Sequence, residues 1–275
     1  MTPPRRVGVL SAAWLYTQYG IVSAVILAPI VWTVLSSFKP SAAVTGYPPA
    51  VLFSPTLENY ERLFTTVPLL HYGLNSVIIA GGSTFFGLLL AVPAAFAVSW
   101  YQVAWPASLA LVARMAPGGL FLLPWYVLFT RLHLINTYTA LILTHAVITM
   151  PVVLWTMISF FDAIPRDVLE SSLVDGSTLG RTIASVAIPL AAPGVVVATV
   201  LSFILSWNYF LFALVLSGIN TTPLTVAAFQ FVGEGVTDWG MLMGTATLLA
   251  LPPLALAFLV QQWLVAGLTF GAVKG

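Results

Sequence analysis

The sequence predicts an all-α polytopic membrane protein with six transmembrane helices and a short helix outside the bilayer. Hydrophobic residues make up 60% of the 275 residues and charged residues only 6%, whereas a soluble domain has roughly 25% charged residues. The few charges leave long neutral stretches, each able to hold the roughly 20 apolar residues that a spanning helix needs. Lipid is therefore the expected solvent of most of the chain.

Turn residues within the neutral stretches set the expected ends of the helices. We expect the first span to stay in the protein, because its apolar stretch is too long for a cleavable signal peptide and no small-residue cleavage pattern follows it. The six expected spans are Ala12–Ser36, Tyr72–Trp100, Pro106–Phe129, Tyr138–Phe161, Pro189–Leu216 and Gly240–Ala266.

Two spans carry further local signals. In the second, small residues recur at every fourth position, which places them on one face and allows close helix packing. In the third, Pro117-Gly118-Gly119 should break the helix, and irregular backbone at this depth is stable only where it is buried in protein or lines water. The residues of the small stripe are Ser83, Gly87, Ala91 and Ala95.

The basic residues favour an orientation with both termini in the cytoplasm. With six spans the two ends lie on one side, and basic residues are enriched in cytoplasmic loops. This orientation gives five basic residues inside and three outside: Arg5, Arg6, Arg166, Arg181 and Lys274 against Lys39, Arg62 and Arg131.

The densest group of charges lies between the fourth and fifth expected spans and includes Asp167, Glu170 and Asp175. Pro165 suits the first turn of a helix, where its missing N–H costs nothing. The acidic residues near that end favour the positive end of the helix dipole, and Gly176 can form a left-handed cap. The pattern is typical of a short helix and turn outside the bilayer, although a plain solvated loop would explain the charges equally well.

This segment also resembles a cytoplasmic motif of the permeases of ABC importers. The motif reads Glu-Ala-Ala, three residues, Gly, nine residues and Ile-x-Leu-Pro. Here it reads Glu170-Ser171-Ser172, Gly176 and Val186-Ala187-Ile188-Pro189, with both spacings kept and serines in place of the alanines. The resemblance implies a cytoplasmic coupling helix that docks on an ATPase subunit through Glu170, Ser171, Ser172, Asp175, Gly176 and Pro189.

Further matches indicate the maltose-type carbohydrate permeases, over about residues 70–275. Two departures are the absence of basic residues after the second span and Tyr209, where an acidic residue is common. The resemblance implies one transmembrane domain over residues 1–275, with a coupling loop at about 162–188. The matching pieces are Asn75-Ser76, Asn136-Thr137-Tyr138, Trp207-Asn208, Thr237-Asp238-Trp239-Gly240 and the ending Val265–Gly275.

The resemblance also implies a set of partners in a bacterial inner membrane. They are a second permease in a heterodimer, two ATP-binding-cassette ATPases that hold ATP and Mg, and an extracytoplasmic solute-binding protein, with no cofactor on this chain. The net charge of +1 gives no reason to expect a nucleic-acid partner. The absence of cysteine excludes disulfides and thiol chemistry.

Three sets of residues are candidates for contact with solute or partners. The ATPase-contacting tail is Gly271, Ala272, Val273, Lys274 and Gly275, and the loop toward the binding protein includes Pro223, Gln230 and Glu234. The candidate substrate pathway comprises Arg114, His145, Asn208 and Tyr209. Arg114 could instead snorkel to the headgroups, and the other three could be packing residues.

Two other classes remain as alternatives. A stand-alone secondary transporter or channel usually carries intramembrane acids to couple ions, and no acidic residue falls inside an expected span. An intramembrane enzyme would need a nucleophile and a base. The nearest nucleophile, Ser83 after Gly81-Gly82, already belongs to the small-residue stripe, and His71, His133 and His145 fit no metal-ligand spacing.

Overall fold

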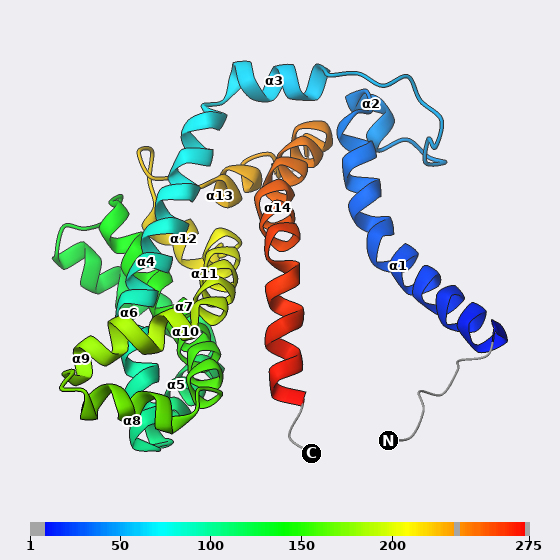
Figure 1. Cartoon of the computed structure of the whole chain (residues 1–275). Coiled ribbons are helices and arrows are strands. Elements are labelled where there is room, and N and C mark those ends of the chain that lie inside the picture. Colours follow the sequence, from blue (N-terminus) through cyan, green and yellow to red (C-terminus); the bar gives the residue numbers. More distant parts are fainter. Residues whose placement is uncertain (1–8, 234–236, 273–275) are drawn as a thin grey trace. The chain divides into compact units, whose positions relative to one another are not determined.

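The computed structural model describes residues 9–233 and 237–272, and all of their regular secondary structure is helical (Figure 1). The all-α prediction is therefore confirmed for the described part of the chain. The helices are α1 (Val9–Ser37), α2 (Ser41–Val44), α3 (Glu58–Thr66), α4 (Leu69–Tyr101), α5 (Trp105–Met115), α6 (Gly118–Arg131), α7 (Tyr138–Asp162), α8 (Arg166–Val174), α9 (Leu179–Thr182), the π-helix η1 (Ile183–Ala187), α10 (Ile188–Leu190), α11 (Ala192–Trp207), α12 (Leu211–Leu216), α13 (Leu224–Phe229) and α14 (Trp239–Ala272).

Contacts within the chain define two compact units. The first combines Met1–Val67 with Phe231–Leu248, and the second combines Pro68–Gln230 with Leu249–Gly275. Each unit is described separately below.

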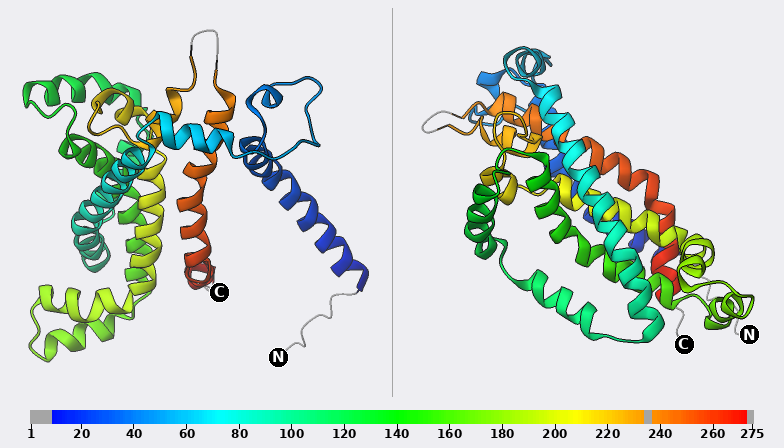
Figure 2. Two further views of the ribbon diagram at one scale, coloured as in Figure 1. Left: turned by 90° about the horizontal axis from the view of Figure 1, so that it is seen from above. Right: turned by 90° about the vertical axis from the view of Figure 1, so that its left-hand side faces the viewer.

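Helix length and composition support a membrane protein. Among the described residues, α1, α4, α7 and α14 are each long and apolar enough to cross a bilayer. Two bent pairs would raise the number of spans to six if each pair crosses once: α5 with α6, and the Leu179–Leu190 stretch with α11. The first pair bends by 91° just before Gly118 (Figure 2), so the break predicted from Pro117-Gly118-Gly119 is confirmed.

The core of the second unit is formed by α4, α7 and α11, which all pack against one another. Ser83, Gly87, Ala91 and Ala95 are all buried along α4, as the small-residue stripe predicts. A side chain at Gly87 would be crowded, because its Cβ would lie 3.2 Å from the hydroxyl of Thr149 on α7. The small residues thus allow the close approach of α4 and α7.

The expected fifth span, Pro189–Leu216, is wrong at both ends. The chain bends by 81° between the Leu179–Leu190 stretch and α11, so Pro189 lies before the bend. At the other end α11 stops at Trp207, and α12 begins only at Leu211. The side-chain amide of Asn208 donates to the carbonyl of Ile204 at 2.9 Å, which also accepts from the backbone N–H of Asn208 at 3.1 Å.

In the first unit, polar side chains fasten α3 to the end of α1 and to the start of α14. The buried amide of Asn59 donates to the carbonyls of Ser37 and Lys39, at 2.9 and 2.8 Å. Arg62 forms an ion pair with Asp238. The other carboxylate oxygen of Asp238 accepts from the backbone N–H of Met241 at 3.1 Å and so caps α14.

Candidate functional site

The short helix α8 is anchored by one apolar residue and otherwise faces outward. Leu169 is only 4% exposed and belongs to the same apolar cluster as Phe161 and Ile164 at the end of α7. Its neighbour Glu170 and the following Ser171 are exposed. The structure thus presents a carboxylate and a small residue on a helix whose position is fixed by the transmembrane core.

The turn after α8 has the geometry that its glycine predicts. Gly176 has φ of +88°, which is the left-handed conformation that favours glycine. Its N–H donates to the carbonyl of Leu173 at 3.0 Å, and that of Asp175 donates to Ser171 at 2.9 Å. The hydroxyls of Ser172 and the buried Thr182 lie 3.1 Å apart, which links α8 to α9.

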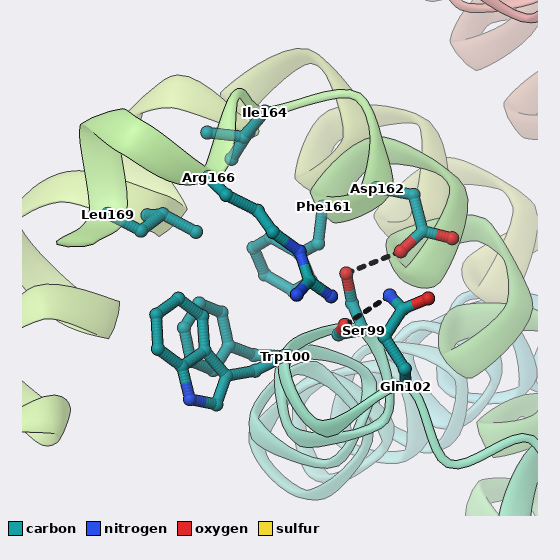
Figure 3. A pocket seen from close by; sticks show the side chains of 9 residues that line it. Ser99, Trp100, Gln102, Phe161, Asp162, Ile164, Arg166 and Leu169 are labelled. Atoms are coloured by element: carbon teal, nitrogen blue, oxygen red, sulfur yellow. Dashed lines mark hydrogen bonds between the residues drawn. The ribbon is translucent and has the colours of Figure 1, made fainter.

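A cavity of about 210 Å³ lies where α4, α7 and α8 meet (Figure 3). Ser99 on α4 donates to the carboxylate of Asp162 on α7 at 2.5 Å, and Gln102 donates to the carbonyl of Ser99 at 2.7 Å. Arg166, the first residue of α8, extends into the cavity toward these groups. The bond between Ser99 and Asp162 thus joins the ends of α4 and α7 beside the start of α8.

The surface around α8 carries exposed charges of both signs. Asp167, Glu170 and Asp175 are exposed, as are Arg166 and Arg181. Exposed charges of both signs suit recognition of a partner surface. Across the described residues, no group of three or more His, Asp or Glu side chains could hold a metal ion.

A second polar cluster lies deep between α4, α7 and α11. His145 is 2% exposed, and its Nδ1 lies 2.9 Å from the hydroxyl of Ser206, which lies 2.8 Å from that of Ser83. The ring of Tyr209 packs edge-on against the imidazole, with ring centroids 5.4 Å apart. We call Ser83, His145, Ser206 and Tyr209 the central polar cluster.

The four residues predicted for the substrate pathway therefore do not form one group in the structure. His145 and Tyr209 are in contact, whereas Arg114 is exposed near the end of α5. Asn208 is also exposed, and its described side-chain bond goes to its own helix. Sequence reasoning assigned Ser83 only to packing and gave no signal for Ser206, because a serine inside an apolar helix does not reveal its partner.

The loop that follows α12 is pinned to the start of α4. Asn75 donates to the carbonyls of Thr222 and Asn220, at 2.9 and 3.2 Å. Tyr138 donates to the side-chain oxygen of Asn75 at 2.6 Å. Two of the family-like pieces, at residues 75–76 and 136–138, thus meet in space.

The expected partner-contact residues differ in what the structure describes. Pro223, directly before α13, is buried, and Gln230, directly after it, is exposed. Gly271 and Ala272 are the last residues of α14. Glu234 and the tail residues Val273, Lys274 and Gly275 lie outside the described residues.

No family model matches the chain. Several proteins named as permeases are similar to it in sequence over most of its length. The probable ABC transporter permease protein y4oR of Sinorhizobium fredii is 33% identical, over 94% of this chain and 95% of the relative. The sulfoquinovosyl glycerol transport system permease protein SmoH of Agrobacterium fabrum is also 33% identical, over 90% and 89%. The trehalose/maltose transport system permease protein MalG of Thermococcus litoralis is 32% identical, over 93% and 94%.

The fold is similar to that of a solved ABC transporter chain. A crystal structure of a bacterial ABC transporter involved in the import of the acidic polysaccharide alginate superposes with a TM-score of 0.74 at 20% identity, covering 95% of this chain and 99% of that one. At this identity the likeness shows the fold alone. Three relatives at 32–33% identity over nine-tenths of the chain decide the family: the protein belongs to the membrane permease subunits of ABC transporters.

Proposed function

We propose that this permease forms half of the translocation pathway of an ATP-driven importer for a sugar or sugar-like solute. Two of its relatives are named for trehalose and maltose and for sulfoquinovosyl glycerol, which are glycosides of different size and charge. The shared chemistry of these solutes is a ring bearing many hydroxyl groups. A second permease would supply the other half of the pathway, in a heterodimer.

The proposed topology has six spans and both termini in the cytoplasm of a bacterial inner membrane. The spans would be α1, α4, the bent pair α5–α6, α7, α11 and α14. This order puts α8 in the cytoplasm and residues 218–238 on the outside, where Gln230 and Glu234 would face a solute-binding protein. The excess of basic residues on the proposed inner side supports this orientation.

The exposed helix α8 is the observation on which the proposed mechanism rests. It would dock on one of two ATPase subunits, where ATP and Mg bind, and the C-terminal tail from Gly271 to Gly275 would reach the same subunits. Leu169 fixes α8 to the core at the end of α7, and the contacts of Ser99 and Asp162 link that end to α4. Closure of the ATPases would thus displace the membrane helices through rigid contacts rather than through a flexible loop.

Family membership removes both alternative classes. Permeases of ABC transporters work with a separate ATPase subunit, which supplies the energy that a stand-alone carrier would draw from coupled ions. The relatives are transport subunits and not enzymes, which removes the intramembrane hydrolase as well.

The experiment replaces Gly176 by proline in the complete transporter. Proline is restricted to φ near −65° and cannot adopt the +88° of this turn, so Gly176→Pro should distort the end of α8. We expect uptake of radiolabelled maltose or trehalose to fall to background while the complex still assembles. The matched control is Gly180→Ala, since a Cβ there meets no atom within 4 Å and the position has no positive φ. Normal uptake by an assembled Gly176→Pro complex would contradict the coupling role of α8.

A further inference from the structure

Two broken helices meet at the side chain of Tyr209. One break lies between α5 and α6, where Gly118 begins the second helix, and the other lies between α11 and α12. A Cβ at Gly118 would lie only 2.7 Å from the hydroxyl of Tyr209, so the glycine leaves room for that oxygen. Irregular backbone at membrane depth is stable where it is buried in protein or lines a cavity. Two such segments packed around one tyrosine mark a functional part of the bundle.

The central polar cluster beside this tyrosine has hydrogen-bonding capacity that the structure does not use. Among the described residues, Nε2 of His145 is enclosed and has no hydrogen-bond partner. Three hydroxyls that are not members of the cluster also lack a partner there: those of Thr84, Ser202 and Thr225. A buried polar group without a partner costs about 1–3 kcal/mol. An apolar residue would pack here at lower cost, so packing alone does not explain the imidazole.

The hydrogen bonds around His145 define what Nε2 can offer. The hydroxyls of Ser83 and Ser206 lie 2.8 Å apart, and the hydroxyl of Ser83 can also donate to the carbonyl of Ala80 at 3.1 Å. The hydroxyl of Ser206 lies 2.9 Å from Nδ1 of His145, so Nδ1 is engaged whichever ring nitrogen carries the hydrogen. Nε2 can then offer either an N–H or a lone pair, and a hydroxyl group can bond to both.

Tyr209 packs against the imidazole that carries this nitrogen. Its ring lies edge-on to the imidazole, and it belongs to the three-residue break rather than to a helix. The tyrosine is only half-buried, whereas His145 is enclosed. A movement of residues 208–210 would therefore uncover the imidazole without disturbing α7 or α11.

We infer that His145, positioned by Ser206 and Ser83, is a hydrogen-bonding subsite for a hydroxyl group of the transported solute, covered by Tyr209 in the described state. The inference rests on the proposed function and assigns part of solute recognition to this permease itself. An imidazole nitrogen and serine hydroxyls are hydrogen-bonding groups that suit a hydroxyl group, which can both donate and accept. A carboxylate or phosphate would call for a cation, and the exposed Arg114 is not part of the cluster.

Cysteine labelling of the complete transporter in proteoliposomes tests this subsite, because the natural chain has no cysteine. Ser206→Cys should be unreactive toward a small water-soluble methanethiosulfonate in the resting complex and reactive during ATP turnover. Saturating maltose or trehalose should slow the labelling severalfold, and Tyr209→Ala should permit labelling without ATP. The matched control is Thr144→Cys, beside His145 and equally buried, which should stay unreactive in every state because its hydroxyl bonds its own helix.

Two outcomes would overturn the subsite. If the Ser206→Cys complex transports sugar but its cysteine stays unreactive, position 206 has only a packing role. If the sugar does not slow the labelling, water reaches position 206 but the solute is not bound there. As an independent measurement, His145→Gln should raise KM for uptake severalfold with kcat nearly unchanged. If uptake falls only in proportion to the amount of folded protein, His145 has a packing role. If the wild type transports neither sugar, the solute is not one of these two disaccharides, and ATP-dependent labelling at position 206 still decides whether the cluster lines the pathway.

Discussion

Asn59 in the first unit and His145 in the second are both buried and polar, but their hydrogen bonding is opposite. The amide of Asn59 donates to two backbone carbonyls and accepts from the hydroxyl of Ser41 at 3.0 Å. The imidazole of His145 has one nitrogen bonded and the other without a partner in the described part of the chain. The fully bonded Asn59 holds two segments together, whereas His145 keeps one nitrogen available for the hydroxyl group of the proposed subsite.

Removing the fully bonded side chain should have the largest effect on stability. Asn59→Leu keeps the size of the residue but leaves the carbonyls of Ser37 and Lys39 buried without donors. Each unsatisfied group costs about 1–3 kcal/mol, so the loss should be several kcal/mol. We expect a marked fall in the melting temperature of the detergent-solubilised complex, followed by size-exclusion chromatography after heating. Asn208→Leu, at an exposed asparagine, is the control and should change it little. If Asn59→Leu and the wild type have equal melting temperatures, the hydrogen bonds of Asn59 do not stabilise the first unit.

A smaller effect is expected at the ion pair of the same unit. The side chains of Arg62 and Asp238 are 38% and 28% exposed, and pairs that water reaches contribute about 0–1 kcal/mol. Asp238→Asn removes the charge but keeps an oxygen that can cap Met241. Its melting temperature should fall slightly at low salt, and the difference from wild type should shrink at high salt because salt screens exposed charges. A salt-independent loss as large as that of Asn59→Leu would show that the pair is enclosed in the complex.

The smallest effect is expected at an unbonded hydroxyl of the second unit. Ser202 is buried, and its hydroxyl has no partner among the described residues, so Ser202→Ala loses no hydrogen bond. Stability should stay within about 0.5 kcal/mol of wild type or rise. Ser206→Ala is the matched comparison on the same helix, and it should be less stable because it removes contacts with both His145 and Ser83. Similar destabilisation by the two variants would mean that the two hydroxyls are equally satisfied.

Local signals explain which parts of the fold could be predicted from the sequence. The stripe from Ser83 to Ala95 repeats with the period of a helix, and Pro117 and Gly176 act through their own backbone preferences. All three appear in the structure as expected. Such features depend only on residues close together in the chain.

The break after Trp207 could not be predicted in the same way. No glycine or proline occurs at residues 208–210. The side chain of Tyr209 packs against His145, and its hydroxyl occupies the room that the missing side chain of Gly118 leaves. Those partners are 64 and 91 positions away in a chain of 275 residues. For the same reason the link between His145 and Ser206 had no signal, although His145 itself was a candidate. Site residues that act through long-range contacts need the fold before they can be recognised.

The π-helix η1 has a consequence for how the gene can change in length. A π-helical turn closes its hydrogen bonds over five residues instead of four and so holds one more residue than an α-helical turn. Loss of one residue within Ile183–Ala187 would leave an ordinary helix with the same faces. A deletion inside α11 would instead rotate everything beyond it by about 100° and carry Ser206 away from His145. Loss of one codon within Ile183–Ala187 should therefore leave the polar cluster intact, whereas the same deletion inside α11 would dismantle it.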